Sequence, residues 1–181
     1  MKLRASTARE WIMWAAVVAS AALLSVLIVG APWLAHRGNT LLAEVVRHAF
    51  AVVCHQQPAR SFHLWGHPLA VCARCTGIYF GAFCGALVYP LLRPLHDRTT
   101  PARHWLVLSA IPLALDWALG FTHLWSNTAL SRCATGLLFG FALAFYVVPG
   151  LIDLGFTLKM IRQARAARLQ GARFLQTRAP R

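Results

Sequence analysis

Residues 11–35 read WIMWAAVVASAALLSVLIVGAPWLA, an uninterrupted apolar run of 25 residues without a charged side chain. An α-helix rises about 1.5 Å per residue, so a helix of this length crosses the hydrocarbon core of a bilayer with some tilt. Tryptophans mark both ends of the run, where indole rings prefer the membrane interface. The run is too long for the apolar part of a signal peptide, so we predict that it is a transmembrane helix.

Three further apolar runs follow, at about residues 76–92, 105–121 and 133–152. Of the 181 residues, 58% are hydrophobic and only 13% are charged. This composition excludes a disordered chain, and a water-soluble domain would carry about 25% charged residues. We therefore predict an all-α integral membrane protein with four transmembrane helices. A single membrane domain is expected over residues 1–156, with a basic tail over residues 157–181.

The charge distribution predicts the orientation of these helices. The chain has 18 lysines and arginines against 5 acidic residues, and the basic side chains stand mainly at the ends of the apolar runs. With the N-terminus in the cytoplasm, 13 basic residues lie on the cytoplasmic side and five on the outer side. The positive-inside rule thus predicts a multi-pass protein of the cell (inner) membrane with both termini in the cytoplasm.

The basic tail could also suggest a nucleic-acid partner. It contains one aromatic residue, Phe174, and no recognised binding motif. We expect the lipid bilayer to be its partner and expect no nucleic acid. The tail is an ordinary positive-inside anchor, or it continues the fourth helix against anionic headgroups.

Small residues recur at helical spacing in two of the runs. Glycines stand four residues apart at positions 77, 81 and 85, and again at 136 and 140. Such strips allow close packing of transmembrane helices. The residues before them are alike, Arg74-Cys75-Thr76-Gly77 and Arg132-Cys133-Ala134-Thr135-Gly136. Two related hairpins and convergent use of small residues both explain this similarity.

Residues 36–75 form the only sizeable segment between apolar runs, and we expect it outside the membrane. Apolar residues recur at helical spacing over Leu41–Val53, which predicts a short interfacial helix. Pro58, Gly66 and Pro68 then indicate a loop.

Three cysteines lie in or beside this outer segment. Cys72 and Cys75 form a C-x-x-C motif, and Cys54 precedes it by 18 residues. Two sulfurs at this spacing can bind one ion, and a third cysteine completes three sulfur ligands. We predict a metal site, with zinc as the expected ion. The fourth ligand is expected to be one of three histidines, His55, His63 or His67.

Two other functions remain open for the same residues. The Cys72/Cys75 pair lies near a helix N-terminus beside Arg74, which favours a reactive thiol. The protein could thus be a membrane thiol–disulfide oxidoreductase with a quinone partner. It could also be a structural or assembly subunit that packs its glycine strips against a membrane-protein partner. The simplest role of the cysteines is a structural staple, metal or disulfide, that holds the outer loop.

Asp116 is the one acidic residue inside the 105–121 run. A charge in hydrocarbon costs about 2.5 kcal/mol or more, so it faces the bundle interior with a partner. We predict an ion pair with Arg74 or Arg132, which begin the neighbouring runs. The candidate catalytic residues are Asp116, Arg74, Arg132 and His55. Small polar groups at the same level predict a pocket for a small molecule or lipid, lined by Gln56, Arg60, Thr76, Asn127 and Thr135.

Several of these residues form an ordered pattern. Cys54-His55-Gln56 precedes Arg60, and Cys72-Ala73-Arg74-Cys75-Thr76-Gly77 follows. Asp116, Asn127, Arg132 and Thr135-Gly136 complete it. This pattern resembles domain of unknown function family 2085, small bacterial and archaeal predicted membrane proteins, over roughly residues 45–145. The resemblance implies a multi-spanning membrane protein with these motif residues, but neither an activity nor a substrate.

Overall fold

The computed structural model describes residues 6–122, 124 and 126–177, with side chains up to residue 165 in the last helix. Its elements are α1 (Ala8–His36), α2 (Thr40–Phe50), η1 (Pro58–Arg60), β1 (His63–Leu64), β2 (His67–Pro68), α3 (Ala73–Leu92), α4 (Arg103–Phe121) and α5 (Ala129–Thr177). Within the described residues, four helices are long and apolar enough to cross a membrane: α1, α3, α4 and the first part of α5. The predicted all-α fold with four such helices is confirmed.

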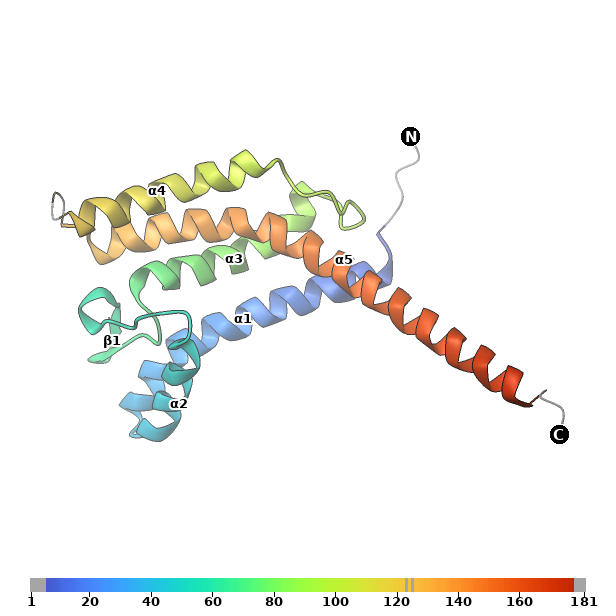
Figure 1. Cartoon of the computed structure of the whole chain (residues 1–181). Coiled ribbons are helices and arrows are strands. Elements are labelled where there is room, and N and C mark those ends of the chain that lie inside the picture. The colour runs from blue at the N-terminus through green and yellow to red at the C-terminus, as the bar shows by residue number, and fades with distance from the viewer. Residues whose placement is uncertain (1–5, 123, 125, 178–181) are drawn as a thin grey trace.

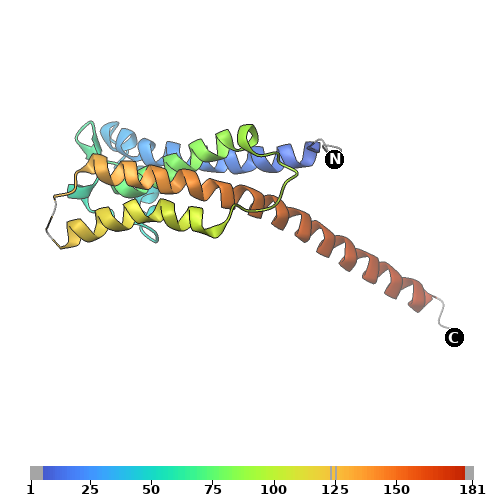
Figure 2. The same cartoon turned by 90° about the horizontal axis from the view of Figure 1, so that it is seen from above.

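The four long helices lie side by side, and the two ends of the bundle differ (Figure 1). One end carries α2, the β1–β2 hairpin and the α4–α5 connection, and we call it the cysteine end. The opposite end is where α1 begins and where α5 leaves the bundle, and we call it the tail end (Figures 1 and 2). The chain therefore enters and leaves the bundle at the same end, as an even number of crossings requires.

The closest helix pair is α3 and α5, which run parallel. The predicted glycine strips face each other in this pair. A Cβ atom at Gly77, Gly81 or Gly85 would overlap with backbone oxygens of α5, and one at Gly136 or Gly140 would overlap with those of α3. Any side chain larger than hydrogen would force the two backbones apart. The glycines thus set the contact that brings the beginnings of the two helices together.

The segment of residues 36–75 is more ordered than the sequence indicates. The short helix predicted over Leu41–Val53 is present as α2, but it ends at Phe50 and a turn carries the chain to Cys54. The expected loop contains a short antiparallel hairpin in which His63 pairs with Pro68 and Leu64 with His67. Trp65 and Gly66 at its tip both have positive φ angles, 51° and 79°. Two-residue strands give no alternating pattern long enough to recognise in the sequence.

Charged and aromatic side chains contact one another at the tail end. The guanidinium groups of Arg9 and Arg98 lie over the ring of Phe156, at 4.3 and 4.1 Å from its centroid. Arg98 also lies 3.4 Å from a carboxylate oxygen of Asp153 and 4.0 Å from one of Glu10. Beyond this point α5 continues as one helix through the expected tail to Thr177 and projects away from the bundle (Figure 2).

Candidate functional site

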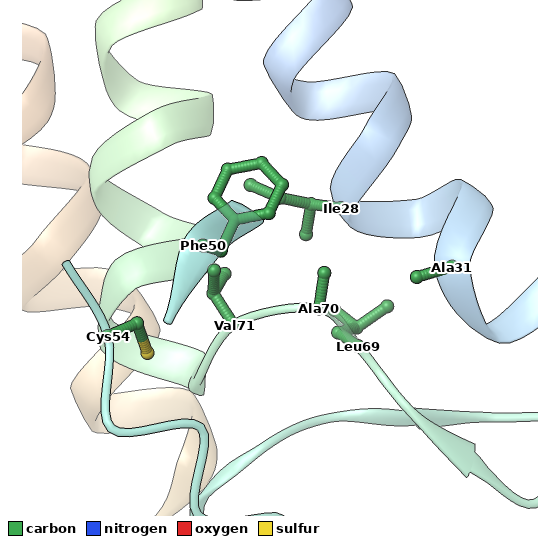
Figure 3. Packing of buried hydrophobic residues seen from close by; sticks show 7 residues of the cluster. All are labelled: Ile28, Ala31, Phe50, Cys54, Leu69, Ala70 and Val71. Carbon is green, nitrogen blue, oxygen red and sulfur yellow. The ribbon is translucent and has the colours of Figure 1, made fainter. Parts of the chain in front are cut away.

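A small apolar core at the cysteine end holds Cys54 in place. Figure 3 shows Cys54 at the edge of a buried cluster formed by α1, the end of α2 and the segment before α3. The other members are Ile28, Ala31, Phe50, Leu69, Ala70 and Val71. The backbone N–H of Ala70 donates to the carbonyl of Ile28 at 3.2 Å, which ties the segment before α3 to α1. This core brings residue 54 beside residue 72.

The sulfur atoms of Cys54, Cys72 and Cys75 form one cluster. All three Sγ atoms lie within 4.8 Å of one another, so they could hold a single metal ion. Cys72 caps α3 and Cys75 lies in its first turn, which places both sulfurs on the same side of the helix start. We predicted that the helix begins at residue 76, but α3 begins three residues earlier, at Ala73. Cys75 therefore belongs to the helix rather than to the loop.

Backbone N–H groups point at the sulfur of Cys54. The N–H of Cys72 donates to this sulfur at 3.2 Å and that of Gln56 at 3.4 Å. Such donors stabilise a thiolate, and sulfur atoms that bind a metal commonly accept hydrogen bonds of this kind. The pKa of the Cys72 thiol is lowered, because the thiols of Cys54 and Cys75 donate hydrogen bonds to its sulfur. Burial opposes this shift.

Gln56 fixes the loop that carries Cys54. Its side-chain amide donates to the carbonyl of Ala70 at 2.8 Å and to that of Arg47 on α2. Its φ angle is +50°, in the left-handed region that residues with a side chain rarely adopt. These hydrogen bonds hold the strained conformation that turns the Gln56 N–H toward sulfur.

The histidines lie outside the sulfur cluster. Among the described residues, no histidine nitrogen belongs to the group of ligand atoms within 4.8 Å. His55 follows Cys54 directly and lines the adjoining cavity, whereas His63 and His67 lie in the β1–β2 hairpin. Which of the three supplies a fourth ligand stays a prediction.

The buried acid is paired with the first of the two expected arginines. Arg74 Nη2 lies 2.6 Å from Asp116 Oδ2, and these side chains are only 19% and 8% exposed. The other carboxylate oxygen accepts from the hydroxyl of Ser131 at 2.9 Å. The predicted Arg74–Asp116 ion pair is thereby confirmed. Ser131 was not predicted, although its place just before Arg132 in the same helix was the available signal.

Arg132 contacts an amide instead of the carboxylate. Its Nε donates to Asn127 Oδ1 at 3.1 Å, and Nη2 donates to the same oxygen. Asn127 in turn donates from Nδ2 to the carbonyl oxygen of Asp116 at 2.8 Å. Gly120 leaves room for this amide, since a Cβ atom there would lie 2.5 Å from Asn127 Nδ2. The alternative Asp116–Arg132 pair is not formed because Asn127 stands between the two.

A cavity of about 430 Å³ opens beside the sulfur cluster. The three cysteines line it, together with His55, Gln56, Arg60, Arg74, Asn127 and Arg132 from the predicted set. Trp117 and Phe121 of α4 also line it and were not predicted. Their rings stack with centroids 5.4 Å apart, next to Asp116 in the sequence.

Two residues expected in the pocket do not line it. Thr76 donates its hydroxyl to the carbonyl of Cys72, and Thr135 donates to that of Ser131, both four residues earlier in the same helix. A threonine inside a helix often satisfies its hydroxyl in this way, so its O–H is not free to donate into a pocket. Asp116 lies behind the lining, since its oxygens are taken up by Arg74, Ser131 and Asn127.

The fold and site define a multi-pass membrane protein with a cysteine cluster at one end of its bundle. The chain belongs to the family described as predicted membrane protein (DUF2085), whose model matches residues 54–146. An uncharacterised protein of Methanocaldococcus jannaschii is 34% identical over 129 residues, which cover 68% of this chain and 83% of that protein. An uncharacterised protein of Methanothermobacter thermautotrophicus is 44% identical over 99 residues, 52% of this chain and 84% of that protein. No solved structure matches the chain.

Proposed function

We propose that this protein is a membrane metalloprotein that binds one zinc ion through Cys54, Cys72 and Cys75. The observation that carries the proposal is the convergence of these three sulfurs within 4.8 Å, although Cys54 is 18 residues away in sequence. Thiolates are soft ligands, and zinc accepts them readily in tetrahedral sites. The N–H groups directed at Cys54 Sγ support the same assignment, because they stabilise a metal-bound thiolate.

Three sulfurs leave one position of a tetrahedral ion for a further ligand. His55 is the best placed of the three candidate histidines, because it adjoins Cys54 and lines the cavity. In a site without a histidine ligand, water or a molecule in the cavity would supply the fourth ligand, as in catalytic zinc sites. Arg74, Arg132 and His55, which line the cavity, are then the groups that would contact such a molecule, and Asp116 would act only through Arg74.

We propose that the cysteine end faces outward and that both chain termini are cytoplasmic. The support is the distribution of charge, with 13 basic residues expected on the tail side and five on the cysteine side. An impermeant thiol reagent applied to intact, reduced and chelator-treated cells should label Cys54 or Cys72. Labelling confined to inverted membrane vesicles would reverse this orientation.

The metal is tested by the native mass of the detergent-purified protein before and after treatment with a chelator. The expected result is an excess of one zinc that the chelator removes. Cys54→Ser should lose the zinc, whereas the control Cys84→Ser should keep it, because Cys84 lies in α3 outside the cluster.

The same measurement separates the redox alternative. A Cys72–Cys75 disulfide lowers the mass by two hydrogens, carries no metal and survives Cys54→Ser. That outcome would replace the zinc proposal with a membrane thiol–disulfide oxidoreductase.

A further inference from the structure

The cavity beside the sulfur cluster is rich in guanidinium groups. Arg60 from η1, Arg74 from α3 and Arg132 from α5 all line it. These residues come from three separate elements, so their side chains approach the cavity from different directions. One carboxylate, Asp116, lies behind them and is paired with Arg74.

Two of these charges have no acidic partner. Within the described part of the chain, neither Arg60 nor Arg132 has a carboxylate oxygen within 4.0 Å. Arg132 is held by the neutral amide of Asn127, which fixes its position without cancelling its charge. The three guanidinium groups and one carboxylate give a net charge of two positive units. A divalent ion with three thiolates adds one negative unit, so the cavity stays positive when the metal is bound.

One donor of Arg74 has no acceptor in the described part of the chain. Arg74 Nε is buried and has no hydrogen-bond partner in the described structure, although Nη2 of the same group binds Asp116. A buried donor without an acceptor costs about 1–3 kcal/mol.

Aromatic rings form another part of the wall. Trp117 and Phe121 on α4 stack on each other, line the cavity and are 53% and 71% exposed. Both lie on a helix apolar enough to span the membrane. The cavity therefore combines a positive interior with an apolar wall on the bilayer side.

We propose that this cavity binds a phosphate group. One guanidinium matches one carboxylate, as Arg74 matches Asp116, whereas guanidinium groups from several directions suit the three or more oxygens of a phosphate. The phosphate belongs to a lipid headgroup or to a soluble anion, and the aromatic wall favours the lipid. This inference rests on the proposed metal site only for the position of the phosphate beside the three sulfurs.

Binding is measured on the full chain in neutral detergent with two probes. Equilibrium dialysis reports inorganic phosphate, and native mass spectrometry counts phosphatidylglycerol bound from mixed micelles, with phosphatidylcholine as the neutral comparison. The variants are Arg132→Gln and Arg60→Gln. Arg37→Gln is the matched control, because Arg37 lies at the same end, stacks over Trp33 and does not line the cavity.

We expect saturable binding of one inorganic phosphate or one phosphatidylglycerol. Arg132→Gln should weaken it about tenfold or more and Arg60→Gln by a few-fold, with no change for Arg37→Gln. Phosphatidylglycerol binding without inorganic phosphate binding assigns the lipid, and the reverse assigns the soluble anion. No saturable binding of either probe, or equal binding by all three variants, would overturn the proposal.

Zinc content measured on the same samples separates the two proposals. A protein that binds phosphate but holds no zinc contradicts the proposed metal site and leaves the phosphate site standing. If the protein holds zinc but Arg60→Gln and Arg132→Gln leave phosphate binding unchanged, only the phosphate site is contradicted. Retention of zinc by Arg60→Gln, which alters an exposed residue, also shows that a loss of binding is not a loss of fold.

Discussion

The beginnings of α3 and α5 carry nearly the same residues but have different surroundings. In α3, Arg74 pairs with the carboxylate of Asp116, and Cys75 belongs to the sulfur cluster. In α5, Arg132 contacts the amide of Asn127, and Cys133 lies outside that cluster. The segment before α3 brings Cys72 and packs against Cys54, whereas the segment before α5 brings Asn127. The neighbouring loops, rather than the shared motif, therefore decide which helix start joins the sulfur cluster and which keeps a positive charge without an acidic partner.

The largest expected effect comes from separating the two helix starts. Gly77→Leu or Gly136→Leu places a side chain against the backbone of the facing helix, so neither can be accommodated without parting α3 and α5. We expect loss of monodisperse folded protein in size-exclusion chromatography for both. The control is Gly150→Leu in α5, where a Cβ atom meets nothing within 4 Å. Normal elution of Gly136→Leu would mean that the two helices do not pack as described.

The second effect distinguishes the two arginines. Asp116→Asn keeps the side-chain shape but leaves Arg74 buried without a counter-ion, which costs about 3–5 kcal/mol for a buried pair. Arg132→Gln removes hydrogen bonds to an amide and should cost about 1.5–3 kcal/mol. Thermal unfolding in detergent should therefore show the larger drop in Tm for Asp116→Asn. A larger drop in Tm for Arg132→Gln would contradict the assignment of the structural ion pair to Arg74 of α3.

The third effect distinguishes the two cysteines. Cys75→Ser removes one of the three proposed sulfur ligands and should abolish stoichiometric zinc, measured by elemental analysis of the purified protein. Cys133→Ser should keep one zinc per chain, because Cys133 is not part of the cluster. Equal zinc content in the two variants would contradict the difference between the helix starts.

The smallest effect is expected where the two helix starts behave alike. Thr76→Val and Thr135→Val each remove a hydroxyl that bonds to a carbonyl of its own helix. Each should lower the free energy of unfolding by about 0.5–1.5 kcal/mol and leave zinc content unchanged. A selective loss of zinc in Thr76→Val would show that this threonine positions Cys72. Thr76 and Thr135 would then differ in role.

The sequence predicts the bundle well, because long apolar runs with tryptophans and basic residues at their ends form few structures other than membrane helices. The glycine spacing also predicts which faces approach closely. The sequence could not show whether Arg74 or Arg132 is the partner of Asp116, since both stand near helix starts at similar depth. Asn127 makes the difference, because it accepts from Arg132 and donates to the carbonyl of Asp116. Spacing likewise could not place Trp117 and Phe121 in the cavity wall, because an aromatic residue on a membrane helix usually faces lipid.

Other features depend on tertiary contacts that no local pattern records. The β1–β2 hairpin is too short for a periodic signal. The positive φ of Gln56 results from hydrogen bonds to residues 47 and 70, on two other segments. The meeting of Cys54 with Cys72 depends on the apolar core around Ile28 and Phe50.

X-ray absorption at the zinc edge of the purified, metal-loaded protein tests the three-cysteine zinc site most directly. The proposed site should give three sulfur ligands at about 2.3 Å and one lighter nitrogen or oxygen ligand. Four sulfur ligands would require a further cysteine and would contradict the three-cysteine site. A shell of nitrogen and oxygen alone would place the metal elsewhere and leave the convergence of Cys54, Cys72 and Cys75 to be explained by a disulfide.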